Sequence, residues 1–385
     1  MKNICHLIFS ICCLTAGTLV LSACFAPLGY KSGDTTLSVG FGGGSAARPT
    51  LSPDDLRYEL TFSGPGGRNF PEYLDGRGTV TVQVVPGRWN ISVRAFEPAD
   101  PEIILAISDT KTIDVNSGKN NVIEIIMRWV DELSIAMVWI DAGTFTMGSE
   151  DPQDTLGVPT DPEHLVTFAQ GFFMGKYPVT QAQYLVVMRN NPSNFTGDLN
   201  RPVEMVTWFD VIEFCNKLSI IEGLTPVYTI SNRTPAIGYP ITSAVVIPNW
   251  NANGYRLPTE AQWEYACRAE TTTGWSHNES LHNDYMWYNA NSGGTTHPVG
   301  QKLANPWGLY DMHGNVYEWC WDWLGNTYYS TPGPWIDPIG PDSGFSRVSR
   351  GGTWNNPARN ARSAIRNGGL PNSQFGNMGF RVVKP

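Results

Sequence analysis

Cysteine is the residue type in this sequence best suited to bind a soft metal or to act as a nucleophile. Beyond the N-terminal apolar segment the chain has Cys215, Cys267 and Cys320, and no two of them form a C-x-x-C pair. Zinc sites and disulfide frameworks need closely spaced or even-numbered cysteines. The spacing therefore predicts neither, and we expect all three to be small buried residues of a core.

Histidine is the second candidate for chemistry. Scattered histidines are surface or core residues more often than ligands, and the spacing here shows no paired motif. His297 and His313 have the type needed for acid–base work, but no partner is evident from the sequence. We therefore predict no catalytic residues. The five histidines beyond the apolar segment are His164, His277, His282, His297 and His313.

The C-terminal segment, Arg350 to Pro385, combines many Asn, Gly and Arg residues with the apolar residues Trp354 and Phe380. Low-complexity disorder would not need such anchors, and ordinary loops are shorter. Binding residues often lie on loops that a rigid scaffold holds. The pattern favours an exposed binding segment.

Helices with readable starts precede this segment. Thr180 and Gln183 form one capping box, and Thr259 and Gln262 form another. A further amphipathic helix is predicted over residues 206–219, from the i, i+3, i+4, i+7 spacing of its apolar residues. Those residues are Val211, Phe214, Cys215 and Leu218.

Strand-like segments and long loops follow the helices. Trp319, Trp321 and Trp323 alternate, which predicts that all three lie on one strand face, where core packing explains them. Helices followed by strands, with large irregular parts, indicate an α+β domain over residues 135–385.

An earlier region, residues 53–130, has apolar residues at every second position between Pro-Gly and Ser-Gly turns. This pattern predicts a small all-β domain, an immunoglobulin-like sandwich that acts as a spacer or adhesion module. Residues 24–52 are interpreted as a flexible tether, in which "TTLSVGF" could be a first strand.

The N-terminus has the pattern of a lipoprotein signal peptide over residues 1–23. Lys2 precedes an apolar run that ends in "LSAC", Leu21 to Cys24. This ending resembles a bacterial lipobox, in which Cys24 becomes the lipidated first residue. An uncleaved N-terminal membrane anchor is the alternative. Acyl chains would tether the protein to a membrane, and we expect it in the cell envelope, on the outer-membrane surface.

The formal net charge is −9, and loss of Lys2 with the signal would make it more negative. A net acidic chain without a basic run is a poor candidate for nucleic-acid binding. No nucleic-acid partner is expected.

Six strings occur in family order between Ile135 and Val383: "GTFTMGS", "YPVTQAQY", "RPVEMVTWFDVIEFCN", "YRLPTEAQWEYACRA", "HPVGQKLANPWGLYDMHGNVYEWCWDW" and "RGGTW…ARSAIR…GFRVV". Together they resemble the formylglycine-generating-enzyme (sulfatase-modifying factor) family. The resemblance implies a C-type-lectin-like fold, and it says less about activity.

The enzymes of that family hold copper with two cysteines, and the resemblance places those positions at Asn356 and Ala361. Soft Cu(I) needs thiolate ligands, which Asn and Ala cannot supply. No cysteine follows Cys320, and the His-x3-His-x-Glu motif of iron-dependent relatives is absent. We expect no enzyme activity and no cofactor required for catalysis.

The resemblance also implies a structural calcium site. "YDMHGNVYEW" matches a calcium-binding segment, which carries over to the carboxylates of Asp311 and Glu318 and the carbonyls of Gly314 and Val316. All are oxygen ligands, as a hard cation requires. The alternative is a tight Gly-Asn turn that Asp311 caps.

The layout of the C-terminal segment resembles the variable regions of diversity-generating-retroelement proteins, in particular those of the treponemal variable-protein type. Arg362, Ser363 and Arg366 match the fixed framework, within a variable region of about residues 348–383. The residues predicted to bind a ligand are Trp354, Asn355, Asn356, Pro357, Arg359, Asn360, Ile365, Asn367, Gly368, Gly369, Leu370, Asn372, Ser373, Gln374, Phe375, Asn377 and Met378.

The sequence thus predicts a non-enzymatic, surface-displayed lipoprotein that binds a protein or a glycan at a diversified C-terminal site. A structural lipoprotein with one fixed partner is the alternative. A sulfatase-modifying enzyme is a further alternative, against which the missing thiols argue.

Overall fold

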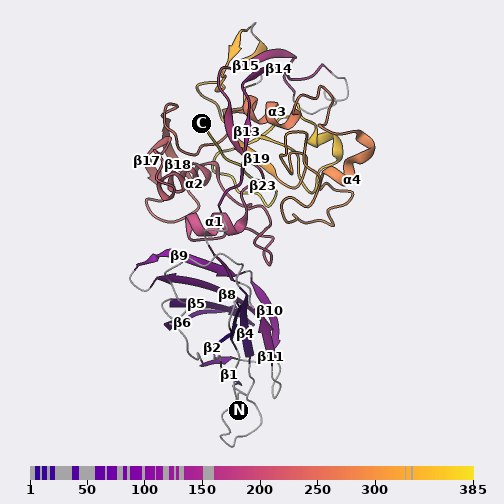
Figure 1. Cartoon of the computed structure of the whole chain (residues 1–385). Coiled ribbons are helices and arrows are strands. Elements are labelled where there is room, and N and C mark those ends of the chain that lie inside the picture. Colours follow the sequence, from indigo (N-terminus) through magenta and orange to yellow (C-terminus); the bar gives the residue numbers. More distant parts are fainter. Residues whose placement is uncertain are drawn as a thin grey trace, which may run out of the picture. The chain divides into compact units, whose positions relative to one another are not determined.

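The computed structural model describes residues 5–8, 11–14, 18–21, 37–42, 57–65, 67–75, 81–84, 87–97, 100–108, 110–115, 121–124, 127–129, 134–150, 160–325, 327–330 and 333–385. The chain divides into two compact units, residues 1–134 and 135–385 (Figure 1). The second unit starts where the sequence analysis places the second domain. The two units are described one by one below.

The described elements of the first unit are all strands. Antiparallel pairing joins β12, β9, β8, β5 and β6 into one sheet, to which β10 adds at β8. A second sheet has the order β11, β4, β3, β2, and β1 pairs with β7. The strands are β1 Cys5–Ile8, β2 Ile11–Leu14, β3 Thr18–Leu21, β4 Leu37–Gly42, β5 Arg57–Gly64, β6 Arg68–Asp75, β7 Thr81–Val84, β8 Gly87–Glu97, β9 Asp100–Ser108, β10 Lys111–Val115, β11 Asn121–Glu124 and β12 Met127–Trp129.

The alternation seen in the sequence becomes a buried face on β5 and β8. Leu60 and Phe62 of β5 are buried, as are Ile91 and Val93 of β8. Leu60 lies opposite Val93, and Phe62 opposite Ile91. Successive side chains of a strand point to opposite faces, so an apolar residue at every second position gives the sheet one apolar face.

The N-terminal predictions fall mostly outside the described residues. Cys24, the predicted lipidation site, lies there, as does most of the tether predicted at 24–52. Strands β1 to β3 lie within the predicted signal peptide, and β4 lies in the stretch expected to hold a first strand. Cleavage and lipidation stay predictions. No helix among the described residues is long and apolar enough to cross a bilayer.

The second unit mixes short helices with several small sheets, and in Figure 1 β19 and β23 lie near its middle while α4 lies at its edge. The helices are α1 Gln181–Met188, α2 Trp208–Ile221, α3 Glu260–Arg268 and α4 His282–Tyr285, with 3-10 turns η3 Glu279–Leu281, η4 Tyr328–Ser330 and η5 Ala358–Ala361. The strands are β13 Met137–Ile140, β14 Gly143–Met147, β15 His164–Phe168, β16 Phe172–Gly175, β17 Tyr228–Thr234, β18 Ser243–Pro248, β19 Tyr317–Trp323, β20 Trp335–Ile336, β21 Arg347–Arg350, β22 Asn367–Gly369, β23 Met378–Gly379 and β24 Val383–Lys384.

Four sheets hold these strands, in the orders β13-β16-β24, β14-β15-β20, β17-β18 and β22-β21-β19-β23. The last sheet carries the C-terminal segment, because β22 pairs antiparallel with β21 and β23 pairs parallel with β19. The C-terminal segment therefore adds strands to two sheets, β22 and β23 to this one and β24 to the sheet of β16.

Both predicted capping boxes are confirmed. The Thr180 and Thr259 side chains each accept the backbone N–H three residues on, and the Gln183 and Gln262 side chains reach back to the cap. A third box at Thr207 starts α2. Each box satisfies N–H groups that a helix start leaves without an intrahelical partner.

Strand β19 runs between two apolar cores. Trp319 and Trp321 join a core around α2, while Cys320 on the other side joins a core around α3. Trp323 is only half-buried, and the register of β19 against β21 shifts between Trp319 and Trp323. The predicted core role holds for the first two tryptophans. All three predicted core cysteines are buried and free.

Candidate ligand-binding surface

Three arginines of the C-terminal segment form a buried framework. Arg366 makes two hydrogen bonds to Glu260, at 2.7 and 2.6 Å, and one to Asp161 at 2.6 Å. Arg350 pairs with Glu264 and lies 3.1 Å from Glu260. Guanidinium groups suit these contacts because their planar donors match a carboxylate at two points.

Arg381 repeats the arrangement on β19. Its guanidinium donates to both oxygens of Glu318 at 2.6 Å, and its remaining donors reach the carbonyls of Gly175 and Tyr310 at 2.9 Å. Arg381 and Glu318 both have a solvent exposure of 0%. Through its contacts with Glu318, Gly175 and Tyr310, Arg381 joins the C-terminal segment to three distant parts of the unit.

Burial and charge compete at these carboxylates. Burial by itself raises the pKa of the Glu264 carboxyl, but Arg268 and Arg350 outweigh it and hold the pKa below its ordinary value. At Asp161 burial and the charge of Glu260 win over Arg366, so the pKa of Asp161 rises to about 7. The framework is thus built from groups that depend on one another.

The residues just before Arg366 are held through their own backbone groups. Arg350 Nη1 donates to the carbonyls of Ser363 at 2.8 Å and Ile365 at 2.7 Å, and the Ser363 N–H donates to the Gly274 carbonyl at 2.7 Å. The guanidinium of Arg362 lies over the Trp275 ring, 4.7 Å from its centroid. Residues 361–366 are all buried.

Fourteen of the seventeen predicted ligand-binding residues are exposed or half-buried in the structure. Leu370 and Phe375 are 53% and 45% exposed, and Asn355, Arg359 and Asn372 are also exposed. Trp354, Asn356, Pro357, Asn360, Asn367, Gly368, Ser373, Gln374 and Asn377 are half-buried. We call these fourteen residues the displayed residues.

Burial contradicts the prediction for three of the ligand-binding residues. Ile365 and Met378 are 2% and 3% exposed, and Gly369 is buried. Gly369 and Met378 belong to strands, and a Cβ on Gly369 would lie 2.8 Å from the Trp319 ring. These residues pack inside the unit and cannot contact a ligand. The sequence pattern did not separate them from their neighbours because small and apolar residues occur in both places.

Trp354 and its neighbours are held by hydrogen bonds of the surface loops. Trp354 Nε1 donates to the Gly376 carbonyl at 3.1 Å, and the Ser292 hydroxyl donates to the Trp354 carbonyl at 2.7 Å. Asn377 Nδ2 donates to the side-chain oxygen of Asn355 at 3.4 Å. The two displayed stretches, 354–360 and 370–377, therefore meet.

A fixed segment, Glu204 to Trp208, supports the second displayed stretch. The Met205 N–H donates to the Phe375 carbonyl at 3.1 Å, and Gln374 Nε2 donates to the Met205 carbonyl at 2.7 Å. The Trp208 N–H donates to the Pro371 carbonyl at 3.0 Å. Met205 has φ 62°, a left-handed conformation that is strained for a residue with a side chain. Sequence reasoning missed this role, since no local pattern marks it.

The residues with catalytic potential have structural partners. His313 Nε2 accepts from the backbone N–H of Ser276 at 3.1 Å, and its Nδ1 lies 2.7 Å from the Ala361 carbonyl. Burial lowers the pKa of His313 to about 4 and raises the pKa of the Cys267 thiol to about 12. His297 stacks on Trp287 at 3.7 Å. Burial thus moves the pKa values of His313 and Cys267 away from neutral pH.

The two positions that would carry copper thiolates differ in burial in this fold. Asn356 is half-buried in a displayed stretch, and its side-chain oxygen accepts from the Thr353 hydroxyl at 3.0 Å. Ala361 is buried. Cys267 and Cys320 lie in the core around α3, and Cys215 lies in the core around α2. Within the described ranges of the second unit, the free thiols are these three core cysteines.

The expected calcium ligands already have protein partners. Asp311 accepts from the Gly300 N–H at 2.8 Å and from Asn315 Nδ2 at 3.3 Å. Glu318 belongs to the Arg381 pair. Gly314 and Val316 are buried. Across the described ranges no group of three or more His, Cys, Asp or Glu is placed to hold a metal. Calcium binding itself stays a prediction.

Asp311 and its neighbours fit the alternative interpretation, a tight turn. Asp311 and Asn315 both have positive φ, 55° and 62°, and Gly314 has φ 87°. A Cβ on Gly314 would lie 2.1 Å from the Trp287 carbonyl oxygen, so only glycine fits.

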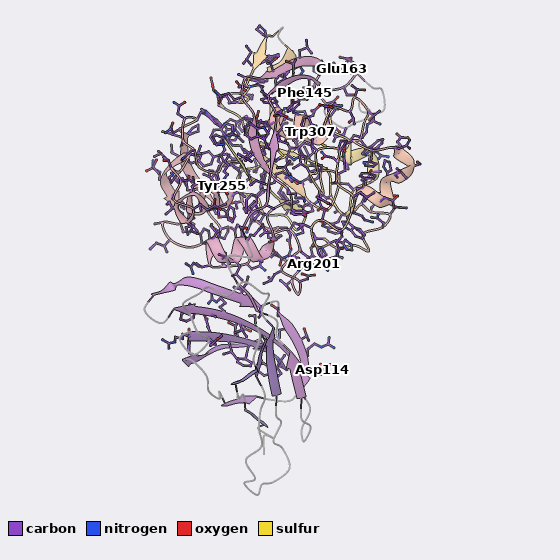
Figure 2. All side chains as sticks on the ribbon, in the orientation of Figure 1. Asp114, Phe145, Glu163, Arg201, Tyr255 and Trp307 are labelled. Atoms are coloured by element: carbon purple, nitrogen blue, oxygen red, sulfur yellow. The ribbon has the colours of Figure 1, made fainter. Side chains whose placement is uncertain are left out.

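A cavity of about 540 Å³ in the second unit is lined by Arg268, Trp275, His277, Arg362 and Glu163 among others. Figure 2 shows Glu163 beside β14 and β15, well away from Arg201, which bonds the loop next to the displayed stretches. Two of its lining residues, Arg362 and Ala364, belong to the C-terminal segment, and the lining includes none of the fourteen displayed residues.

Comparison with known families now connects the fold to known proteins. Residues 130–385 match the model of the sulfatase-modifying factor enzyme 1-like domain. The chain belongs to this family. Its second unit has the C-type-lectin-like fold of formylglycine-generating enzymes, as the sequence predicted.

The proteins similar to this chain include one named as a chaperone, one named as an enzyme and one named as a variable protein. The chaperone protein LppX of Paenibacillus barcinonensis is 38% identical over 241 residues, 55% of this chain and 80% of that protein. The formylglycine-generating enzyme of Thermomonospora curvata is 29% identical over 302 residues, 68% of this chain and 97% of that protein. The solved structure of Treponema denticola variable protein 1 is 36% identical with a TM-score of 0.59, and covers 65% of this chain and 95% of that one. The predicted resemblance to a treponemal variable protein is confirmed.

Proposed function

We propose that this chain is a non-enzymatic binding protein whose displayed residues form a diversified site for a protein or glycan ligand. The observation that carries the proposal is the separation within one segment. Residues 361–366 are buried around the framework arginines, while residues 354–360 and 370–377 are exposed or half-buried. Side chains can change on such a surface without loss of the fold, as they do in antibody loops.

The similarity to Treponema denticola variable protein 1 supports the same function. Formylglycine-generating enzymes are relatives too, so the family alone does not decide between binding and catalysis. The chemistry of the residues favours binding, because Asn356 and Ala361 replace the two thiolates that Cu(I) needs.

The N-terminal part of the proposal is anchorage. Cys24 would carry acyl chains on a membrane of the cell envelope, and the strands of the first unit would act as a spacer. The similarity to a protein named LppX is compatible with this arrangement.

Diversification is tested in DNA from sibling isolates. We expect substitutions between Val348 and Val383 to fall on codons of displayed residues such as Asn355 and Asn372, and a near-copy of the segment to lie nearby. Codons for Arg350, Arg366 and Arg381 should stay unchanged. An invariant segment without a copy would instead indicate one fixed partner.

Catalysis is tested directly. The purified chain, loaded with Cu(I), is incubated with a peptide bearing a sulfatase cysteine motif, and peptide mass is recorded over time. We expect no conversion of the cysteine to an aldehyde. Turnover above that of an inactivated control would contradict the non-enzymatic proposal.

A further inference from the structure

The displayed residues include few aromatic side chains. Only Trp354 and Phe375 are aromatic among them, whereas energetically dominant residues of protein interfaces are enriched in Trp and Tyr. The structure places another aromatic residue beside them. Phe195 packs edge-on against Trp354, with ring centroids 5.3 Å apart and an angle of 82°. It comes from the loop between α1 and Glu204, outside the variable region.

Both backbone groups of Phe195 are held by buried side chains. Its N–H donates to Glu204 Oε1 at 2.8 Å, and its carbonyl accepts from Gln181 Nε2 at 2.9 Å. Glu204 and Gln181 both have a solvent exposure of 0%. A loop residue fixed on both sides loses little conformational freedom when a ligand binds, which favours affinity.

The loop of Phe195 and the displayed stretches form one continuous surface. A Cβ on Gly376 would lie 3.2 Å from Asn194 Nδ2 and 3.8 Å from a Phe195 ring carbon. The Gly376 carbonyl is also the acceptor for Trp354 Nε1. Glu204 and Met205 are consecutive, so one short segment supports both loops: the carboxylate of Glu204 holds Phe195, and the backbone of Met205 holds Gln374 and Phe375.

We propose that Phe195 is a fixed aromatic contact of the binding site, against which an apolar side chain of a protein ligand packs. The displayed residues would then select the ligand, while Phe195 contributes to binding in every variant. Its ring is half-buried and Asn194 beside it is exposed, so both can meet a ligand. This inference rests on the proposed function and names the class of ligand for the same site.

The experiment uses residues 24–385, the chain without its predicted signal peptide, displayed on yeast. Codons for the five exposed displayed residues (Asn355, Arg359, Leu370, Asn372 and Phe375) are randomised, and cells are selected on purified lysozyme as an arbitrary protein probe. Clones with different sequences are kept. The dissociation constant for lysozyme is then measured before and after Phe195→Ala in each clone.

Truncation of an aromatic hot-spot residue at an interface weakens binding by a factor of about thirty or more. We expect Phe195→Ala to do so in most clones, whatever their displayed residues, and Phe195→Leu to weaken binding less. Leu165→Ala, at a 63% exposed site on β15, is the control and should change nothing. Unchanged dissociation constants for Phe195→Ala across the clones would overturn the inference.

Two measurements distinguish loss of fold, failure of the proposed function and failure of the fixed contact at Phe195. Thermal unfolding of each variant shows whether Phe195→Ala weakens binding through loss of fold, which Phe195→Leu should avoid. Failure to recover any binder from a well-displayed library would contradict the proposed function, and the contact with it. Binders that tolerate Phe195→Ala would contradict the fixed contact alone.

Discussion

Residues 361–366 and residues 370–377 come from the same C-terminal segment, yet they have opposite roles. The first stretch is buried throughout, and its two arginines are 4% and 3% exposed. The second is exposed or half-buried throughout. Arg359, a few residues earlier, is exposed, so residue type does not decide the role. What differs is the surroundings: Arg366 meets the buried carboxylates of Glu260 and Asp161, and Arg362 lies over the Trp275 ring.

The comparison teaches how a surface can vary on a stable unit. Ion pairs inside the core fix the chain at Arg350, Arg366 and Arg381, and they lie between and around the displayed stretches. The second displayed stretch is bound in part by pairs of backbone groups, since the carbonyls of Phe375 and Pro371 accept the N–H groups of Met205 and Trp208. Backbone groups are the same for every residue except proline, so these bonds survive exchange of the side chains.

The largest expected effect comes from breaking a framework pair. Arg366→Ala leaves Glu260 and Asp161 buried without their shared cation, and removing one partner of a buried pair costs about 3–5 kcal/mol. Tryptophan fluorescence during denaturation measures it, since most tryptophans lie in the second unit. Arg359→Ala is the matched control and should stay within about 0.5 kcal/mol. Equal losses of stability in Arg366→Ala and Arg359→Ala would contradict the division of the segment into buried framework residues and displayed residues.

A smaller but clear effect is expected where the structure corrected the sequence. Ile365→Ala removes a buried side chain and should lower the free energy of unfolding by about 2–5 kcal/mol. Leu370→Ala removes a 53% exposed side chain and should change it by about 0.5 kcal/mol or less. Denaturant midpoints of the two variants give the comparison. If Leu370→Ala were the more costly change, Ile365 would not be a core residue.

At Glu204, the buried residue that accepts the Phe195 N–H, we expect the free energy of unfolding to depend on pH. Burial raises the pKa of the Glu204 carboxyl from 4.5 to about 7, although backbone N–H groups of Phe195 and Asn194 oppose the shift. Between these pH values the unfolded chain ionises this group and the folded chain does not, so folding loses stability as pH rises.

The matched variant is Glu204→Gln, which cannot ionise. Relative to this variant, the wild type should lose stability from pH 4.5 to about 7 and then show a constant difference. Denaturation midpoints at pH 5, 6, 7 and 8 measure the difference. Parallel pH profiles would mean that Glu204 is ionised in the folded chain near pH 5.

The smallest expected effects are those of the displayed residues. Asn355→Ala, Asn372→Ala and Arg359→Ala should each change the free energy of unfolding by about 0.5 kcal/mol or less, and the triple variant by about their sum. Thermal unfolding of the single and combined variants checks this. A cooperative loss in the triple variant would show that these side chains help to hold the segment.

Local patterns predicted the elements that depend on neighbours in sequence. The capping boxes at Thr180 and Thr259 were readable because cap and partner lie three residues apart. The family strings predicted the fold, and the missing thiols at Asn356 and Ala361 needed no structure. The burial of Gly369 and Met378 was not predictable, since it follows from strands that pair far along the chain, and no local pattern marked Ile365 as buried.

The sequence by itself determined the family, the helix starts, the absence of a copper thiolate pair and the composition of the C-terminal segment. Each depends on residue type and short spacing. Only the tertiary structure decided which residues of that segment are displayed, and that Phe195 joins them across about 160 positions of sequence. It also decided that Glu318 faces Arg381. The reason is physical: burial and pairing depend on which distant side chains meet, and short-range patterns carry no record of that.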